Sequence, residues 1–173
     1  GDNKIKNELL SNKKYIIKTY GCQMNINDSD IVKSILDHQG MAMNNSEIDS
    51  DLVLINTCSI RENAENKIWN LLNELTFIKK EKQKNNKNLY IGVLGCMAER
   101  LKDKLVHEKR SVDLVIGPDS YRDLPRLLNL LFSQEENNDR QYLINTRLSL
   151  DETYADLIPS HETGPSAYVS IMR

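Results

Sequence analysis

The chain has 173 residues, of which 39% are hydrophobic and 28% charged, and its formal net charge is −2. This composition is typical of a globular protein with one core, and the small net charge gives no electrostatic footprint for nucleic acid. The apolar runs, such as LVLI at 52–55, are too short to span a bilayer, and the N-terminal residues lack the apolar segment of a secretory signal. We therefore expect a cytoplasmic protein in a reducing environment, without a membrane partner.

Short apolar runs with strand character alternate with amphipathic helical patterns along the chain. The predicted strands are residues 14–20, 51–57, 88–95 and 112–117, with a weaker candidate at 141–145. The predicted helices lie at 28–38, at 60–82, around Leu101 and Leu105, and around Tyr121, Leu124, Leu128 and Leu131. In the first of them, the apolar face toward the core is expected to carry Ile31, Val32, Ile35 and Leu36. This alternation indicates right-handed βαβ units, and the uninterrupted apolar strands indicate burial on both faces. We predict an α/β fold with a mostly parallel sheet of four to five strands and helices on both faces, a variant of the flavodoxin-like architecture.

The same patterns divide the chain into segments. Residues 1–11 are expected to be a flexible N-terminus, 12–132 the folded domain, and 133–173 an extra strand and a linker. Within the domain, the basic run KKEKQKNNK at 79–87 is interpreted as a solvated helix end, because Lys and Asn suit frayed helix termini.

The three cysteines are an odd number, and a disulfide framework is not expected in a reducing compartment. Cys22, Cys58 and Cys96 each follow a predicted strand, at separations of 36 and 38 residues, about one strand–helix repeat. In a flavodoxin-like order the second, first and third predicted strands lie side by side, and these strands carry the cysteines. Neighbouring strands are about 4.8 Å apart, so adjacent strand ends fall within roughly 10 Å. We expect the three thiols to converge at the carboxyl edge of the sheet, where open α/β folds bind ligands.

A predicted helix start follows each cysteine. After Cys22, Asn27 or Asp28 is the expected N-cap, and the second helix begins with a capping-box pattern at Ser59 and Glu62. The positive end of a helix favours the thiolate, which is the form that binds metal. The placement of the thiols therefore suits metal ligands.

The remaining residues narrow the kind of site. His38, His107 and His161 are expected on the surface away from the thiols, which disfavours a zinc site and a Cys–His nucleophile. Three thiolates without a fourth protein ligand fit an iron–sulfur cluster with one open iron. Gly21 and Gly95 permit close backbone approach to a bulky ligand, or a tight turn. Side chains that could donate hydrogen bonds around the sulfurs, or serve as caps and turn residues, are Gln23, Asn25, Asn56, Ser59 and Arg61.

The segments around the cysteines resemble a known family. TYGCQMNINDSD, LINTCSIRENAENKIWNLL and GVLGCMAER are similar to the cysteine segments of the N-terminal methylthiotransferase domain of radical-SAM enzymes that modify tRNA or a ribosomal protein. The resemblance covers roughly residues 14–131, and three motifs in order at family-like spacing make it specific. The wording GCQMN resembles the tRNA 2-methylthio-isopentenyladenosine synthases, whereas the ribosomal-protein branch usually has Gly-Cys-x-Lys-Asn.

This resemblance implies that Cys22, Cys58 and Cys96 bind an auxiliary 4Fe-4S cluster, whose open iron carries the sulfur of the methylthio group. The implied partner is tRNA, modified at C2 of the isopentenyladenosine next to the anticodon. The family normally continues after a segment like SAYVSIMR into a radical-SAM barrel with a second 4Fe-4S cluster and S-adenosylmethionine. Because this chain stops at Arg173, the resemblance implies a fragment that lacks the barrel and the RNA-binding module. We expect that fragment to be inactive by itself and monomeric.

Other interpretations stay open at the level of sequence. The chain could belong to a ribosomal-protein aspartate methylthiotransferase, or it could be a non-catalytic α/β module with a structural metal. A flavodoxin-like nucleotide binder is disfavoured because the chain has no glycine-rich phosphate loop.

Overall fold

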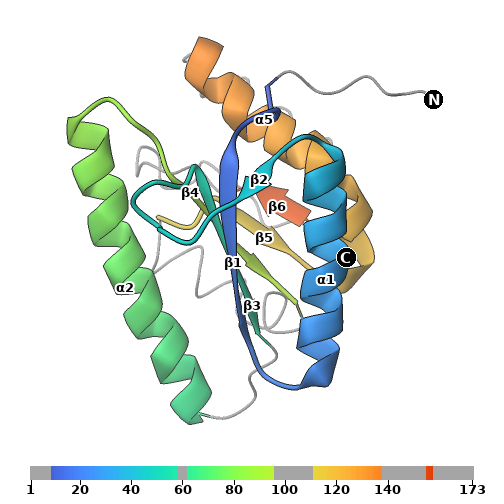
Figure 1. Ribbon diagram of the computed structural model, residues 1–173. Helices are drawn as coiled ribbons and strands as arrows, with labels where there is room; N and C mark the ends of the chain where they lie inside the picture. Colours follow the sequence, from blue (N-terminus) through green and yellow to red (C-terminus); the bar gives the residue numbers. More distant parts are fainter. Residues whose placement is uncertain (1–8, 58–61, 96–110, 138–154, 158–173) are drawn as a thin grey trace.

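The computed structural model describes residues 9–57, 62–95, 111–137 and 155–157, which form a sheet flanked by helices (Figure 1). In chain order the strands are β1 (Lys14–Tyr20), β2 (Ala42–Met43), β3 (Leu52–Thr57), β4 (Tyr90–Leu94), β5 (Leu114–Ile116) and β6 (Ala155–Leu157). The helices are α1 (Gln23–His38), α2 (Glu62–Lys84), the 3-10 helix η1 (Pro118–Asp123) and α5 (Leu124–Asn137). The helix predicted around Leu101 and the strand predicted at 141–145 lie outside the described residues.

The strands form a 6-stranded sheet in the order β2-β1-β3-β4-β5-β6. All pairs are parallel except that of β5 with β6, which is antiparallel. The α/β class and the flavodoxin-like order are therefore confirmed. The predicted order of the cysteine strands was wrong, because it placed the first of them, residues 14–20, between the other two. The short strand β2, which was not predicted, takes that position beside β1 instead. The strands that precede the three cysteines are β1, β3 and β4, with β3 in the middle, and they are still neighbours.

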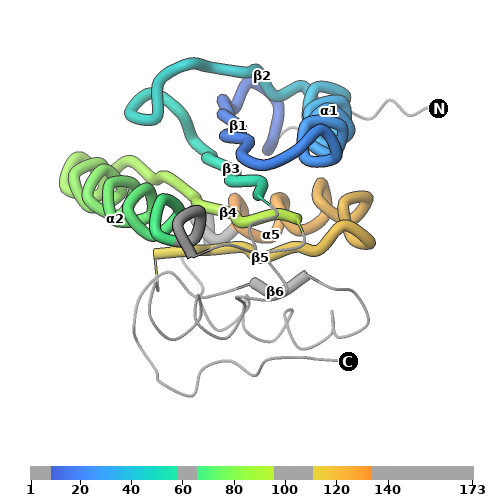
Figure 2. The backbone as a smooth tube through the Cα atoms, turned by 90° about the horizontal axis from the view of Figure 1, so that it is seen from below, coloured from blue at the N-terminus to red at the C-terminus, as the bar shows by residue number. Residues whose placement is uncertain are grey.

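Helices cover both faces of the sheet, as predicted (Figure 2). Alternate residues of β3 divide between two cores: Leu52 and Leu54 pack with α1 and α5, while Val53 and Ile55 pack with α2. The helix residues that complete these cores are Val32, Leu36, Leu124 and Leu128 on the first face and Ile68, Leu72 and Leu75 on the second. Because both faces are covered, every residue of β3 and β4 is buried.

Two predictions about helix surfaces are corrected. Ile31 of α1 is exposed rather than on the core face, since the buried stripe passes through Val32 and Leu36. The basic run at 79–87 is not a uniformly solvated helix end, because Lys79 is only 4% exposed and Lys82 only 9%. None of the described helices is long and apolar enough to cross a lipid bilayer.

The buried lysines join the end of α2 to the amino-terminal edge of the sheet. Lys79 forms a buried ion pair with Asp113, whose carboxylate also accepts the backbone N–H of Ile91 at 2.9 Å. The Lys79 ammonium lies 5.5 Å from the centre of the Tyr90 ring. A buried lysine needs such partners because desolvation of its charge is costly.

Candidate functional site

The strands that carry the cysteines end side by side at the carboxyl edge of the sheet. Tyr20 of β1 is the register partner of Thr57, and Asn56 of β3 is the partner of Leu94 in β4. Cys22 follows β1 after one glycine, and Thr57 and Gly95 are the residues directly before the other two cysteines. Cys58 and Cys96 themselves lie outside the described residues, so their convergence with Cys22 stays a prediction.

Cys22 is itself the N-cap of α1, which corrects the prediction that Asn27 or Asp28 caps this helix. Its backbone is extended, with φ −100° and ψ −173°, and its carbonyl accepts the backbone N–H of Asn25 at 3.0 Å. Gly21 makes the turn from the strand with φ +119°, a conformation that L side chains rarely adopt. The thiol is therefore exposed at the positive end of a helix of 16 residues.

The Asn25 side chain holds the backbone of Cys22. Its Oδ1 accepts the Cys22 backbone N–H at 3.2 Å, which is one half of a capping box. The same oxygen lies 3.6 Å from the Cys22 Sγ, which donates to it as a thiol. A metal-bound thiolate has no proton to donate, so of the two contacts with Asn25 Oδ1 only the one from the backbone N–H is compatible with ligation.

A buried pair of asparagines connects this cap to the sheet. Asn25 is 3% exposed and Asn56 is 0% exposed. Asn25 Nδ2 donates to Asn56 Oδ1 at 3.1 Å, and Asn56 Nδ2 donates to the Asn25 carbonyl at 3.1 Å and to Ser29 Oγ at 2.8 Å. Ser29 Oγ is also 2.7 Å from Thr19 Oγ1 of β1. The beginning of α1 is thus hydrogen-bonded to the ends of both β1 and β3.

Gly95 brings the end of β4 against the same pair. Its φ is +97°, and its backbone N–H donates to the Ile116 carbonyl at 3.2 Å. A Cβ at this position would lie 2.8 Å from Asn56 Oδ1 and 2.9 Å from the Thr57 carbonyl oxygen. Only a residue without a side chain fits there, which gives the glycine before Cys96 a specific role.

The other predicted site residues divide between described and undescribed parts of the chain. Gln23 is exposed and its Nε2 donates to Asn27 Oδ1 at 3.3 Å, within α1. His38 is exposed at the last residue of α1, at the opposite edge of the sheet. Those outside the described residues are Ser59, Arg61, His107 and His161. Sequence reasoning named Asn25 and Asn56 separately as donors but missed their mutual pairing, since they are 31 residues apart.

Within the described ranges, no group of three or more His, Cys, Asp or Glu side chains is placed to hold a metal ion. The environment of Cys22 nevertheless fits a thiolate ligand of an iron–sulfur cluster. Its side chain is exposed, it sits at the positive end of α1, and the groups that support it from below are neutral amides.

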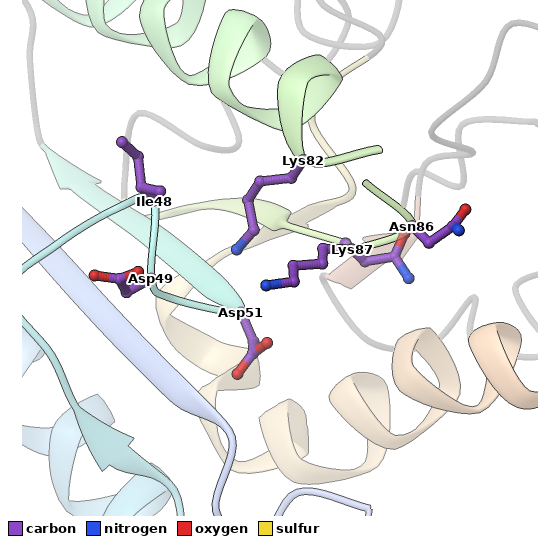
Figure 3. A pocket seen from close by; sticks show the side chains of 7 residues that line it. Ile48, Asp49, Asp51, Lys82, Asn86 and Lys87 are labelled. Carbon is purple, nitrogen blue, oxygen red and sulfur yellow. The ribbon is translucent and has the colours of Figure 1, made fainter. Parts of the chain in front are cut away.

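A pocket of about 380 Å³ lies at the opposite, amino-terminal edge of the sheet. It is lined by Ile48, Asp49, Asp51, Lys82, Asn86, Lys87 and Asn88, and Figure 3 shows both lysines extending toward the loop of the two aspartates. Asp51 accepts the backbone N–H of Lys14 at 2.9 Å, and Lys82 donates to the Ser50 carbonyl. Burial lowers the pKa of Lys82, and Asp51 opposes that shift. The contacts of Asp51 and Lys82 connect the end of α2 with the beginnings of β1 and β3. The pocket lies at the opposite edge of the sheet from Cys22.

Comparison with known proteins identifies the family. A family model described as "Uncharacterized protein family UPF0004" matches residues 14–117. The chain is 49% identical over 157 residues to a tRNA-2-methylthio-N(6)-dimethylallyladenosine synthase of Chloroherpeton thalassium, covering 91% of this chain and 33% of that protein. It is 48% identical over 170 residues to the mitochondrial tRNA methylthiotransferase CDK5RAP1 of Rattus norvegicus, covering 96% of this chain and 28% of that protein.

The chain thus spans about a third of the length of these curated relatives. The family model covers more than half of the chain and includes β1 to β5, with the strands that precede all three cysteines. The chain therefore belongs to the family UPF0004, and its predicted resemblance to the N-terminal domain of the methylthiotransferases is confirmed.

Proposed function

We propose that this chain is the auxiliary iron–sulfur-cluster domain of a tRNA methylthiotransferase. The observation that carries the proposal is the register of β1, β3 and β4, because it places the ends of the three strands that precede the cysteines side by side. Cys22 is exposed there at the N-terminus of α1. The names of the relatives support the transfer of a methylthio group to tRNA. Cys22, Cys58 and Cys96 would be the cluster ligands.

The cluster, when bound, supplies an iron without a protein ligand at which the sulfur of the methylthio group is delivered. The chain's own residues prepare the place for it. The end of α1 offers positive potential to the Cys22 thiolate, and Asn25 orients the backbone from which that side chain projects. The exposure of Cys22 leaves room for a bulky group at this edge.

The substrate we propose is the N6-isopentenyl (dimethylallyl) adenosine beside the anticodon of tRNA, which receives the methylthio group at C2. S-adenosylmethionine and a second 4Fe-4S cluster would act in the part of the enzyme that the relatives have in addition to this region. tRNA would be bound by the whole enzyme, since this chain carries a net charge of only −2. A cytoplasmic location stays a prediction, because the rat relative is named mitochondrial.

Anaerobic reconstitution with iron and sulfide tests the cofactor. We expect about four iron and four sulfide per chain, as in a [4Fe–4S] cluster. Cys22→Ala, Cys58→Ala and Cys96→Ala should each abolish the bound cluster, while His38→Ala should retain it as a matched control. A single tightly bound zinc, with no iron retained, would instead favour the non-catalytic metal module.

The substrate is tested with the full-length protein to which this region belongs. Cells that lack it should lose the methylthio group from isopentenyladenosine in tRNA, measured by mass spectrometry of tRNA nucleosides. An unchanged tRNA pool together with loss of methylthio-aspartate from a ribosomal protein would overturn the tRNA assignment in favour of the alternative branch.

A further inference from the structure

A single hydrogen-bonded pair of side chains touches all three segments that lead to the cysteines. Asn25 binds the backbone of Cys22, and Asn56 stands two residues before Cys58 in β3. Gly95, directly before Cys96, packs against the Asn56 side chain so closely that a Cβ would lie 2.8 Å from its Oδ1. The pair therefore lies at the junction of β1, β3 and β4.

The hydrogen bonds of Asn25 and Asn56 fix the position of α1 relative to β3. Both hydrogens of Asn56 Nδ2 have acceptors, the Asn25 carbonyl and Ser29 Oγ, and Asn56 Oδ1 accepts from Asn25 Nδ2. Both side chains are almost completely buried. A shift of α1 along β3 would leave these groups unpaired in the interior, which is costly, so the pair resists sliding.

Apolar core packing by itself fixes the position of α1 along β3 less precisely than these hydrogen bonds do. Apolar side chains interact without directional preference, whereas hydrogen bonds require a defined distance and angle. At the carboxyl edge the pair replaces apolar contacts between α1 and β3 with directional ones. The end of β1 joins the same network through Thr19 and Ser29, whose hydroxyl oxygens are 2.7 Å apart.

We propose that Asn25 and Asn56 are positioning residues that hold the three cysteine-bearing strand ends at the spacing needed for one trithiolate site. The inference rests on the proposed function, because it assigns a role toward the cysteines of that site. It predicts that the preformed spacing exists before any metal binds and that it depends on Asn56, which has no described contact with Cys22.

Trivalent arsenic tests the spacing without iron or sulfide, because As(III) binds three thiols and releases its three hydroxides as water. The reduced chain has three cysteines, so a thiol titration counts directly how many each bound As(III) consumes. We expect the unsubstituted chain to bind one As(III) and to lose three titratable thiols.

The informative variants differ in severity. Asn56→Leu is similar in size but removes every hydrogen bond of the Asn56 side chain. We expect As(III) affinity to fall about 10- to 100-fold, as for other groups that orient metal ligands. Ser29→Ala removes one acceptor and keeps a strong helix former, so it should stay folded and lose roughly 2- to 10-fold, the equivalent of one net hydrogen bond.

Thr76→Val is the matched control for destabilisation. It removes the contact of 2.6 Å between Thr76 Oγ1 and Ser111 Oγ, which lies away from the carboxyl edge, and As(III) affinity should not change. Thermal melting of each variant verifies folding. If Asn56→Leu does not fold, the comparison of Ser29→Ala with Thr76→Val decides.

The outcomes separate the inference from the proposed function. If folded Asn56→Leu and Ser29→Ala bind As(III) like the unsubstituted chain, or if that chain does not use three thiols, the positioning inference is overturned. If the unsubstituted chain binds As(III) through three thiols, with the expected losses in the variants, but never assembles iron and sulfide, the proposed cluster fails and the positioning inference stands.

Discussion

The two edges of the sheet are held together by different chemistry. At the carboxyl edge, neutral groups of Asn25, Asn56 and Ser29 connect α1 with β3. At the amino-terminal edge, charged groups connect α2 with the sheet: Lys79 pairs with Asp113, just before β5, and Lys82 reaches the Ser50 carbonyl, just before β3. Both arrangements satisfy buried polar groups, but only one of them places formal charges in the interior.

This difference fits a division of labour between the edges. A buried ion pair beside metal-binding thiols would alter their charge balance, because electrostatic interactions are strong in a low-dielectric interior. Amides provide directional hydrogen bonds without a net charge. The amino-terminal edge has no described cysteine, and ionic contacts can stabilise the fold there without affecting the proposed site.

Asp113→Asn should give the largest loss of stability. The new side chain can still accept the Ile91 N–H, but Lys79 stays buried without a counter-charge, and breaking a buried pair costs about 3–5 kcal/mol. Urea unfolding at pH 7 measures this loss. The double variant Lys79→Met with Asp113→Asn should recover much of it, because no buried charge remains.

The same variant sharpens the comparison between the edges. As long as Asp113→Asn is folded, its As(III) affinity should equal that of the unsubstituted chain. A decrease as large as that of Asn56→Leu would show that the two edges are not independent.

Gly92 in the middle of β4 and Gly95 just after it should differ in their tolerance of a methyl group. Gly95→Ala places a Cβ 2.9 Å from the Thr57 carbonyl oxygen at φ +97°, so strain and overpacking together should cost about 2–4 kcal/mol. Gly92→Ala meets Leu54 Cδ2 at 2.7 Å, the end of a side chain that can shift, and should cost about 1 kcal/mol. Denaturant unfolding of both variants measures the difference, and equal costs would contradict the special role of Gly95.

The smallest effect is expected from Asp37, which accepts hydrogen bonds from Tyr15 at 2.6 Å and Lys33 at 2.7 Å. Burial acts to raise the pKa of Asp37, but the bonds from Lys33 and Tyr15 outweigh it and the pKa is lowered. A lowered folded-state pKa gives stability that is present above the unfolded value and is lost as the pH falls through the folded pKa. Asp37→Asn should therefore cost less than about 1 kcal/mol at pH 7, and still less near pH 3.

The acid titration also discriminates between the edges. The side chains of Asn25 and Asn56 do not titrate, so the stability deficit of Asn56→Leu should stay constant between pH 7 and pH 3. Unfolding curves at both pH values for the two variants provide the measurement. A deficit of Asn56→Leu that shrinks in acid like that of Asp37→Asn would refute the distinction between a neutral and an ionic edge.

Much of this fold was predictable because its signals are local. The strands β1, β3, β4 and β5 were recognised within two residues at each end, since continuous apolar runs mark buried parallel strands. The strand β2 was missed because two exposed residues carry no hydrophobic pattern. The buried Lys79 and Lys82 were misread as solvated, because nothing near them in sequence announces Asp113 or the Ser50 carbonyl.

The sequence by itself determined the α/β class and the position of each cysteine just beyond a strand, because hydrophobic periodicity and covalent order are properties of adjacent residues. Only the tertiary structure decided that Cys22 caps α1, that Asn25 meets Asn56, and that Gly95 closes against them. The contacts of Asn56 with Asn25 and with Gly95 join residues separated by tens of positions, and their energy comes from burial and from hydrogen-bond geometry that exist once the strands have paired.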